Sequence, residues 1–127
     1  MKRDIDLLRL VLLQIEAVGN PEEPLIHSLG VDGKDQAIVN EHVKLLIESG
    51  YIEGEIKYST NNRILLTAIR GLTPKAYDLL DNIRNNELWQ RIRERIATTT
   101  GTASLPIIEH FAHQVVSAAL ARPSNTK

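Results

Sequence analysis

The stretch from residue 40 to residue 80, NEHVKLLIESGYIEGEIKYSTNNRILLTAIRGLTPKAYDLL, decides the fold that this sequence predicts. It starts inside a helix that stops at Gly50, because glycine readily takes the left-handed conformation common just after a helix. Two β-prone runs follow, at 51–59 and 63–71. The asparagines between them tolerate the positive φ of a tight hairpin turn. We therefore expect a helix that leads directly into a two-stranded hairpin.

Another helix is expected where the hairpin ends. Thr73 is a good N-cap, and Pro74 suits the first helical position, where its missing N–H costs nothing. Asn85 and Asn86 then break or bend the chain. The helical spacing predicts that the buried face consists of Ala76, Tyr77, Leu80 and Ile83.

Two helices are expected before the hairpin, at 4–18 and 35–49. Residues 25–31 between them are compatible with one turn of helix or with a short strand, and we favour the strand. Asp4 can cap the first helix, and Leu13 interrupts its polar stripe, which then needs cover from another segment or a partner. The first apolar face consists of Ile5, Leu7, Leu8, Val11, Leu12, Ile15 and Val18. The second consists of Ile38, Val39, His42, Val43, Leu46 and Ile47.

Two further helices are expected after residue 86, separated by a linker at 98–104. Ser104 can cap the last of them, at about 105–121. The sequence therefore predicts a core at 1–85, a helical extension at 86–121 packed on the core or on a partner subunit, and a frayed tail at 122–127.

The composition is that of an ordinary globular chain. Its 127 residues carry a formal net charge of −1, which argues against a strongly basic binder of nucleic acid. The absence of cysteine excludes disulfides, thiolate metal sites and a cysteine nucleophile. Charged residues interrupt the apolar start, and no stretch is long enough to span a bilayer, so we expect no signal peptide, no membrane segment and a cytoplasmic location.

The order helix, short element, helix, hairpin and three helices predicts an α+β, mainly α fold of winged-helix-like type, with the hairpin as the wing. The blocks that carry a resemblance are MKRDIDLLRLVLLQIE, HVKLLIESGYIEG, LTPKAYDLLDNIRNNELWQRIRERI and SLPIIEHFAHQVV. In order and spacing they resemble the uncharacterised family numbered 2513 among the domains of unknown function, whose members are small bacterial and phage-associated proteins.

This resemblance covers nearly the whole chain and is most specific at Met1–Asp4 and His42–Leu46. It implies a winged-helix-like fold whose second helix is reduced or replaced, and it implies no activity. Residues 25–34 depart from the helix-turn-helix pattern, because they offer no clear second helix. That departure weakens an inference from the fold to DNA reading.

The hairpin carries the best candidate for chemistry. Between residues 57 and 75 the chain has four cations and no acid, and Asn61 and Asn62 add donors at the turn. Cations and amides of this kind could lie along a duplex backbone. The alternative is a solvated hairpin whose cations discourage edge-to-edge pairing. The four cations are Lys57, Arg63, Arg70 and Lys75.

The helix before the hairpin offers a second set of candidates. Gln36, Asn40 and Lys44 recur every four residues and are expected to share one exposed stripe. Glutamine and asparagine can pair with adenine in a major groove, and lysine can take a phosphate or guanine. Acids outnumber lysines on this helix, however, so an ordinary polar face is the competing interpretation.

Neither a metal, a cofactor, a small-molecule ligand nor an enzyme activity is predicted. Glu109, His110 and His113 lie close in sequence, but the chain has no HExxH motif and no phosphate-binding glycine loop. His42 lies on the apolar side of its helix, so we expect a partly buried core histidine with one hydrogen-bond partner.

The C-terminal helices are apolar enough to need cover, either from the core or from a second copy in a two-fold dimer. We favour a homodimer through Leu13, Trp89, Ile92, Ile96, Phe111 and Val115. The leading functional hypothesis is a DNA-binding, transcription-regulator-like protein of phage or prophage origin. The alternative is a protein–protein adaptor or dimerisation module that binds no nucleic acid.

Overall fold

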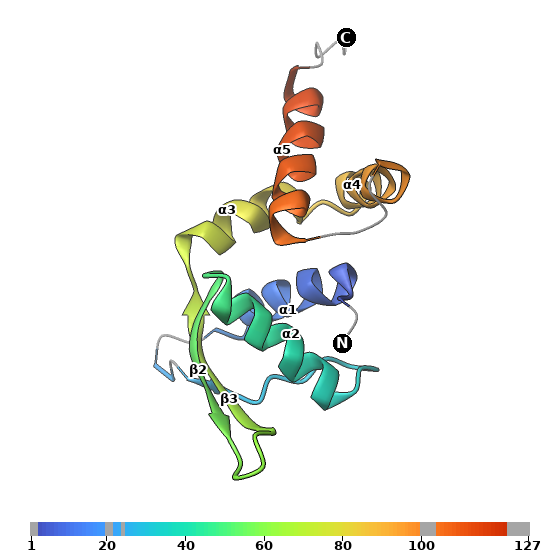
Figure 1. Ribbon diagram of the computed structural model, residues 1–127. Helices are drawn as coiled ribbons and strands as arrows, with labels where there is room; N and C mark the ends of the chain where they lie inside the picture. Colours follow the sequence, from blue (N-terminus) through green and yellow to red (C-terminus); the bar gives the residue numbers. More distant parts are fainter. Residues whose placement is uncertain (1–2, 20–21, 24, 100–103, 122–127) are drawn as a thin grey trace. The chain divides into compact units, whose positions relative to one another are not determined.

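The computed structural model describes residues 3–19, 22–23, 25–99 and 104–121. In this part of the chain, five helices and a three-stranded antiparallel sheet make an α+β fold that is mainly helical (Figure 1). The chain divides into two compact units, Met1–Asp78 and Leu79–Lys127. The division falls inside α3 (Pro74–Ile83), whereas the sequence predicted a boundary after residue 85. The predicted tail at 122–127 lies outside the described residues.

Helix α1 (Ile5–Val18) begins at the predicted cap. The Asp4 carboxylate accepts hydrogen bonds from the N–H groups of Asp6 and Leu7 at 3.0 and 3.2 Å. Val18 was expected on the buried face, but it is 47% exposed because the last turn of α1 is uncovered on that side. The residues that α1 does bury are Leu7, Leu8, Val11, Leu12 and Ile15.

Helix α2 (Gln36–Glu48) is capped by Asp35, whose carboxylate accepts from the N–H of Ala37 at 3.2 Å. It ends before Gly50, which has the predicted left-handed conformation with φ 84°. Ile38 was expected in the core but is 43% exposed, because the first turn of α2 has no cover on that side. The side chains buried along α2 are Val39, Asn40, His42, Val43 and Leu46.

The sheet consists of β1 (Ile26–His27), β2 (Ile52–Tyr58) and β3 (Ile64–Leu72) in the order β1-β3-β2, with antiparallel pairing throughout. The strand favoured for residues 25–31 is confirmed as the short β1. Its register pairs Ile26 with Ile69, so β1 lies beside the middle of β3.

The pairing of β2 with β3 contains two irregularities, one between Glu53 and Gly54 and one between Lys57 and Tyr58. At the first of them the strands approach closely. A Cβ atom at Gly54 would lie 2.5 Å from the carbonyl oxygen of Ala68. Glycine is therefore needed at this position of β2.

The core of the first unit lies between its helices and its sheet. Helix α1 contacts α2 and β3, and α2 contacts both strands of the hairpin. Tyr51 and Ile69 from the hairpin are buried there with Leu46 from α2. The turn between β2 and β3 extends beyond α1 and α2 (Figure 1). The fold therefore presents the hairpin turn to solvent and anchors the base of the hairpin.

Helix α3 starts as predicted, with Pro74 first and the Thr73 hydroxyl accepting from the N–H of Ala76 at 3.3 Å. Ala76, Leu80 and Ile83 are buried as expected. Tyr77 was expected with them, but it is 45% exposed. Tyr77 therefore lies on the outer side of α3.

The second unit contains α4 (Asn86–Thr99) and α5 (Leu105–Ala121), which contact each other. Ser104 caps α5 as predicted, with its hydroxyl accepting from the N–H of Ile107 at 3.3 Å. The residues assigned to a dimer interface in this unit are all buried within one copy of the chain: Trp89, Ile92, Ile96, Phe111 and Val115. Leu13, in the first unit, is half-buried. No described helix is both long and apolar enough to cross a membrane.

Candidate nucleic-acid interface

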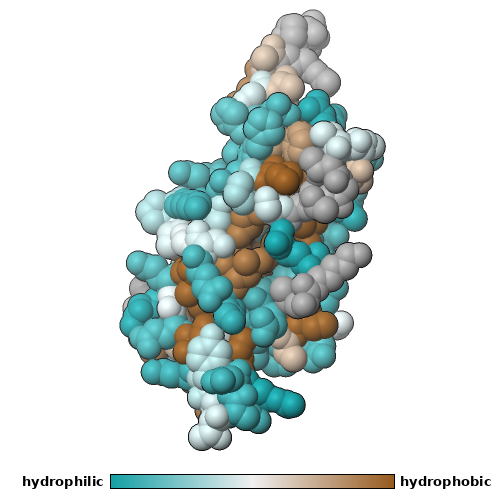
Figure 2. Space-filling view, in the orientation of Figure 1, coloured by the Kyte–Doolittle hydropathy of each residue, from teal (hydrophilic) through white to brown (hydrophobic). Residues whose placement is uncertain are grey.

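The hairpin that the sequence predicts as a wing consists of β2, β3 and the turn at residues 59–63, and we refer to it as the wing. The N–H of Asn62 donates to the Ser59 carbonyl at 3.0 Å, and the N–H of Ser59 donates to the Arg63 carbonyl at 2.8 Å. Asn62 has φ 63°, as expected for asparagine in this turn. Residues 60–62 therefore form a three-residue loop, in which a type I turn is followed by the left-handed Asn62. Asn61, Asn62 and Arg63 are all exposed at its end. The end of the hairpin, at the bottom of Figure 2, is mainly hydrophilic.

Two of the four predicted cations share one carboxylate. Lys57 Nζ lies 3.4 Å from Glu55 Oε1, and Arg70 Nη2 lies 3.3 Å from Glu55 Oε2. These two cations, Lys57 first, lower the pKa of the Glu55 carboxyl below its ordinary value. The sequence pattern missed this arrangement because Glu55 lies just outside the acid-free segment. All three side chains are more than half exposed, so these pairs are weak.

Lys75, another of the four predicted cations, has a structural role. Lys75 Nζ donates to the carbonyl of Ser49 at 3.2 Å and lies 4.5 Å from the centre of the Tyr51 ring. Thr73 Oγ1 donates to the neighbouring carbonyl of Gly50 at 2.7 Å. A cation at the C-terminal end of a helix satisfies its free carbonyls and complements its dipole. Lys75 therefore fastens α3 to the end of α2 and does not belong to the wing surface.

Arg63 is the cation that the wing leaves available. It is exposed at the turn, and in the described part of the chain no carboxylate pairs with it. Its backbone N–H donates to the Ser59 hydroxyl at 3.3 Å, which positions the residue at the end of the turn. The guanidinium can donate two parallel hydrogen bonds to a phosphate.

The expected stripe of Gln36, Asn40 and Lys44 does not form one exposed surface. Asn40 is only 8% exposed, and its Oδ1 accepts from Gln36 Nε2 at 2.8 Å. Gln36 Nε2 also donates to the carbonyl of Leu29 at 2.9 Å. The loop before α2 is not helical, so its Leu29 carbonyl has no partner from a helix backbone. The Gln36 amide, which also donates to Asn40, supplies that partner and holds the loop against α2. This is a correction to the exposed stripe that the four-residue spacing predicted.

Lys44 is instead placed beside the wing. Its Nζ lies 5.8 Å from the centre of the Tyr58 ring at the end of β2. Tyr58, and after it Glu48, raise the pKa of the Lys44 ammonium. Sequence reasoning did not select Tyr58, although an exposed tyrosine next to the wing turn could have been found by its position in the β2 alternation. The structure therefore joins Lys44 to the wing through Tyr58.

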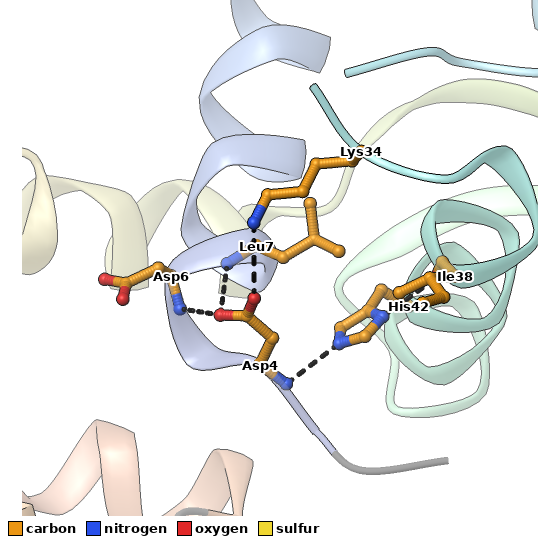
Figure 3. Close-up of polar contacts among 6 residues, drawn as sticks. All are labelled: Asp4, Asp6, Leu7, Lys34, Ile38 and His42. Atoms are coloured by element: carbon orange, nitrogen blue, oxygen red, sulfur yellow. Dashed lines mark hydrogen bonds and ion pairs between the residues drawn. The ribbon is translucent and has the colours of Figure 1, made fainter. Parts of the chain in front are cut away.

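A polar cluster joins the start of α1 to α2 (Figure 3). The N–H of Asp4 donates to His42 Nε2 at 2.9 Å, and His42 Nδ1 lies 2.8 Å from the carbonyl of Ile38. Because a backbone N–H can only donate, Nε2 accepts and Nδ1 carries the proton. His42 is completely buried and has two partners, where we expected partial burial and one partner. Lys34 Nζ lies 3.6 Å from Asp4 Oδ2.

Glu109, His110 and His113 were considered as metal ligands from the sequence, which predicts no metal. No three histidine, aspartate or glutamate side chains of the described part of the chain lie together as metal ligands would. His110 of the predicted histidine pair is exposed and lies against the ring of Phe111, with the ring centres 5.3 Å apart.

Comparison with known proteins settles the family. The model of the family described as "Hypothetical protein (DUF2513)" matches residues 2–103, well over half of the chain. The chain belongs to the DUF2513 family. The resemblance found in the sequence is thereby confirmed. A curated relative named "Uncharacterized protein", from Haemophilus influenzae strain Rd, is 37% identical over 121 residues, which cover 95% of this chain and 100% of the relative. No solved structure matches the chain.

The DUF2513 match includes both α2 and the wing. His42–Leu46, one of the two most specific blocks of the resemblance, contains one core residue and one residue of the candidate interface. His42 is a core residue that joins α2 to the start of α1, and Lys44 lies beside the wing. In this DUF2513 protein the candidate interface therefore consists of Lys44, Lys57, Tyr58, Asn61, Asn62 and Arg63.

Proposed function

We propose that this DUF2513 protein is a cytoplasmic, winged-helix-like DNA-binding protein of the transcription-regulator type, in keeping with the phage or prophage origin that its family resemblance implies. The element order α1-β1-α2-β2-β3 and the sheet order β1-β3-β2 support the winged-helix assignment. A loop at residues 28–35 stands where a helix-turn-helix would have its second helix. The proposal therefore assigns DNA contact first to the wing.

One observation carries the proposal: the wing turn is exposed, uncharged except for Arg63, and free of acids. The chain has no acidic residue between Ile56 and Tyr77. Arg63 and the two asparagine amides stand together at the end of the turn. Guanidinium and amide groups in this arrangement donate to phosphate oxygens, and the cation displaces condensed counterions.

Lys57 and Lys44 extend this surface along β2. Lys57 is exposed, and its pairing with Glu55 is a surface ion pair that a phosphate can replace at little cost. Lys44 Nζ lies 5.8 Å from the centre of the Tyr58 ring, and Tyr58 is 47% exposed. In this proposal a duplex backbone laid along the wing meets Arg63 at the turn, with Lys57 on β2 and Lys44 beside Tyr58 as additional cations.

A titration of the purified protein with random-sequence duplex DNA, at low and at moderate salt, tests the proposal. Arg63→Ala should weaken binding uniformly and reduce the salt slope by about one, because one phosphate contact is lost. Glu55→Gln should strengthen binding, because it removes the carboxylate that holds Lys57 and Arg70. Arg91→Ala is the matched control, since Arg91 is also an exposed arginine and lies on α4. Absence of binding at low salt would show that the proposal is wrong.

A second candidate function has one observation in its favour. The exposed side of α2 carries acids together with Ile38, a large apolar side chain that is 43% exposed. Such a surface suits a protein partner better than a phosphate backbone. If the titration shows no binding, the adaptor function becomes the better hypothesis, and α2 becomes the surface to test.

A further inference from the structure

The two amide side chains that could read bases from α2 already have hydrogen-bond partners within the chain. The Gln36 amide donates both to Leu29 and to Asn40, and Asn40 is 8% exposed. A base contact by Gln36 would release the loop carbonyl of Leu29, and a contact by Asn40 would require it to leave the core. Breaking such partly buried hydrogen bonds leaves polar groups without their partners, which offsets what a base contact contributes.

The remaining exposed surface of α2 repels DNA or is indifferent to it. Asp35 caps the helix, and Glu41 and Glu48 follow along its length. Both glutamates act on the nearby Lys44 ammonium, where they raise its pKa. Of the exposed residues of the first turn, Ala37 and Ile38 have no side-chain hydrogen-bonding groups, and the Gln36 amide already donates within the chain. In a major groove this surface would bring carboxylates toward two phosphate backbones. Of its donors, the Gln36 amide is already hydrogen-bonded within the chain and Lys44 lies beside the wing.

The wing supplies the opposite chemistry, but it has little power to discriminate sequence. Its cations and amides suit phosphate oxygens, which are the same at every base pair. Arg63 is the wing side chain that could enter a minor groove, where A·T and T·A present the same acceptors. Contact through the wing therefore fixes the position of the protein on the backbone without identifying a sequence.

From these observations we infer that this protein binds the backbone of duplex DNA irrespective of sequence, with the wing in contact and α2 held outside the major groove. The inference rests on the proposed DNA-binding function and names the substrate class of the same site. Binding of this kind is weak and strongly dependent on salt, with dissociation constants of about 10⁻⁴ to 10⁻⁶ M at physiological salt.

The absence of cysteine from the chain makes a direct test of this geometry possible. The variants Asn61→Cys and Ile38→Cys each provide one cysteine, to which a fluorophore is attached. The first label lies on the wing turn and the second on the exposed first turn of α2. Both positions are exposed, so the labelled proteins should fold as the wild type does, which circular dichroism checks. Each is titrated with three duplexes of equal length: A·T-rich, G·C-rich and mixed. Unlabelled wild-type protein, added as competitor, reports the dissociation constants of the unmodified chain.

We expect the three wild-type dissociation constants to agree within about tenfold, since specific recognition separates sites by about 10³ or more. The label at position 61 should respond to each duplex, and the label at position 38 should respond to none. A spread beyond tenfold, or a response at position 38, would overturn the inference while leaving DNA binding in place. If wild-type protein binds no duplex even at low salt, the proposed function itself fails.

Discussion

Two polar side chains in the core of the first unit, His42 and Thr67, are equally buried and differ in their hydrogen bonding. Both are 0% exposed. His42 uses both ring nitrogens, one toward Asp4 and one toward Ile38. The Thr67 hydroxyl has no hydrogen-bond partner in the described part of the chain. At the residue scale, burial alone therefore does not say whether a polar side chain stabilises this fold.

Thr67→Val should leave stability unchanged or raise it by about 1 kcal/mol, because it removes an unsatisfied buried hydroxyl and keeps the shape of the side chain. His42→Leu is the matched variant at the same burial. It should lower stability by about 1–3 kcal/mol, since the N–H of Asp4 loses its acceptor. Urea unfolding of both variants measures the contrast. A loss at Thr67→Val as large as that at His42→Leu would mean that the hydroxyl has a partner in solution.

At the element scale, the wing depends on one glycine. Glu53 pairs with Gly71 and Gly54 pairs with Ile69, so the strands are out of simple register at this point. Gly54 allows the two backbones to approach at this irregularity, where a side chain would meet the Ala68 carbonyl. The hairpin that the sequence predicts is therefore bent at a position that depends on both strands.

Gly54→Ala should destabilise the fold by about 1–3 kcal/mol, because the new methyl group meets backbone that has to shift. Gly71→Ala is the control within the same hairpin. A Cβ there has nothing within 4 Å, so this variant should be neutral or slightly stabilising. Thermal unfolding of the two variants gives the comparison. Equal losses would show that any side chain on the hairpin backbone is harmful and that the close approach is not the cause.

The Glu55 pairing predicts a pH dependence of wing stability. The pKa of Glu55 is lowered below its ordinary 4.5 by Lys57 and Arg70, so folding favours the charged form. This small stabilisation is complete above about pH 4.5 and is lost as the pH falls through the lowered pKa. The Tm difference between wild type and Glu55→Gln should therefore shrink toward zero in acid.

Glu53→Gln provides the comparison on the same strand, since Glu53 is exposed and no ion pair links it to a cation in the described residues. Measured over the same acidic range, it separates the loss of a carboxylate on β2 from the loss of the two ion pairs. A constant difference for Glu55→Gln would show that the two ion pairs do not persist in solution.

At the scale of the whole molecule, the question is how many copies of the chain make the functional protein. The homodimer is a prediction from the apolar character of the C-terminal helices. Trp89, Ile92 and Ile96 of α4 and Phe111 of α5 are buried within a single copy. Their burial gives them a role in the stability of one chain, so a dimer would have to use other surface.

Phe111→Ala should lower stability by about 3 kcal/mol, as expected for a large apolar side chain removed from a core. The loss should be the same at all protein concentrations, because Phe111 is covered within one copy. Measuring the Tm of wild type and variant over a hundredfold range, about 1 to 100 μM, checks this. A wild-type Tm that rises with concentration, and a variant that abolishes the rise, would restore the predicted dimer interface.

The sequence alone determined where the helices start and stop, the hairpin and its turn, and the family. Asp4, Thr73 and Ser104 cap helices as predicted, and Gly50 and Asn62 take the conformations that their residue types suggested. These signals succeed because a cap or a turn involves residues only a few positions apart. Periodicity also identified most of the core, and it failed at Val18, Ile38 and Tyr77, where whether a face is covered depends on distant segments.

The tertiary structure decided which candidate side chains are available. Asp4 and His42 meet across 38 positions, Glu55 pairs with Arg70 across 15, and Lys44 meets Tyr58 across two elements. Gln36 and Asn40 have the spacing of a recognition helix, yet the Gln36 amide is hydrogen-bonded to Leu29 and to Asn40, and Asn40 is buried. A pattern within one helix cannot show such an arrangement, because the partners that use up a charge or an amide come from elsewhere in the chain. Hence residue types and spacing selected the wing, and three-dimensional packing reduced the candidate interface to it and the adjacent Lys44.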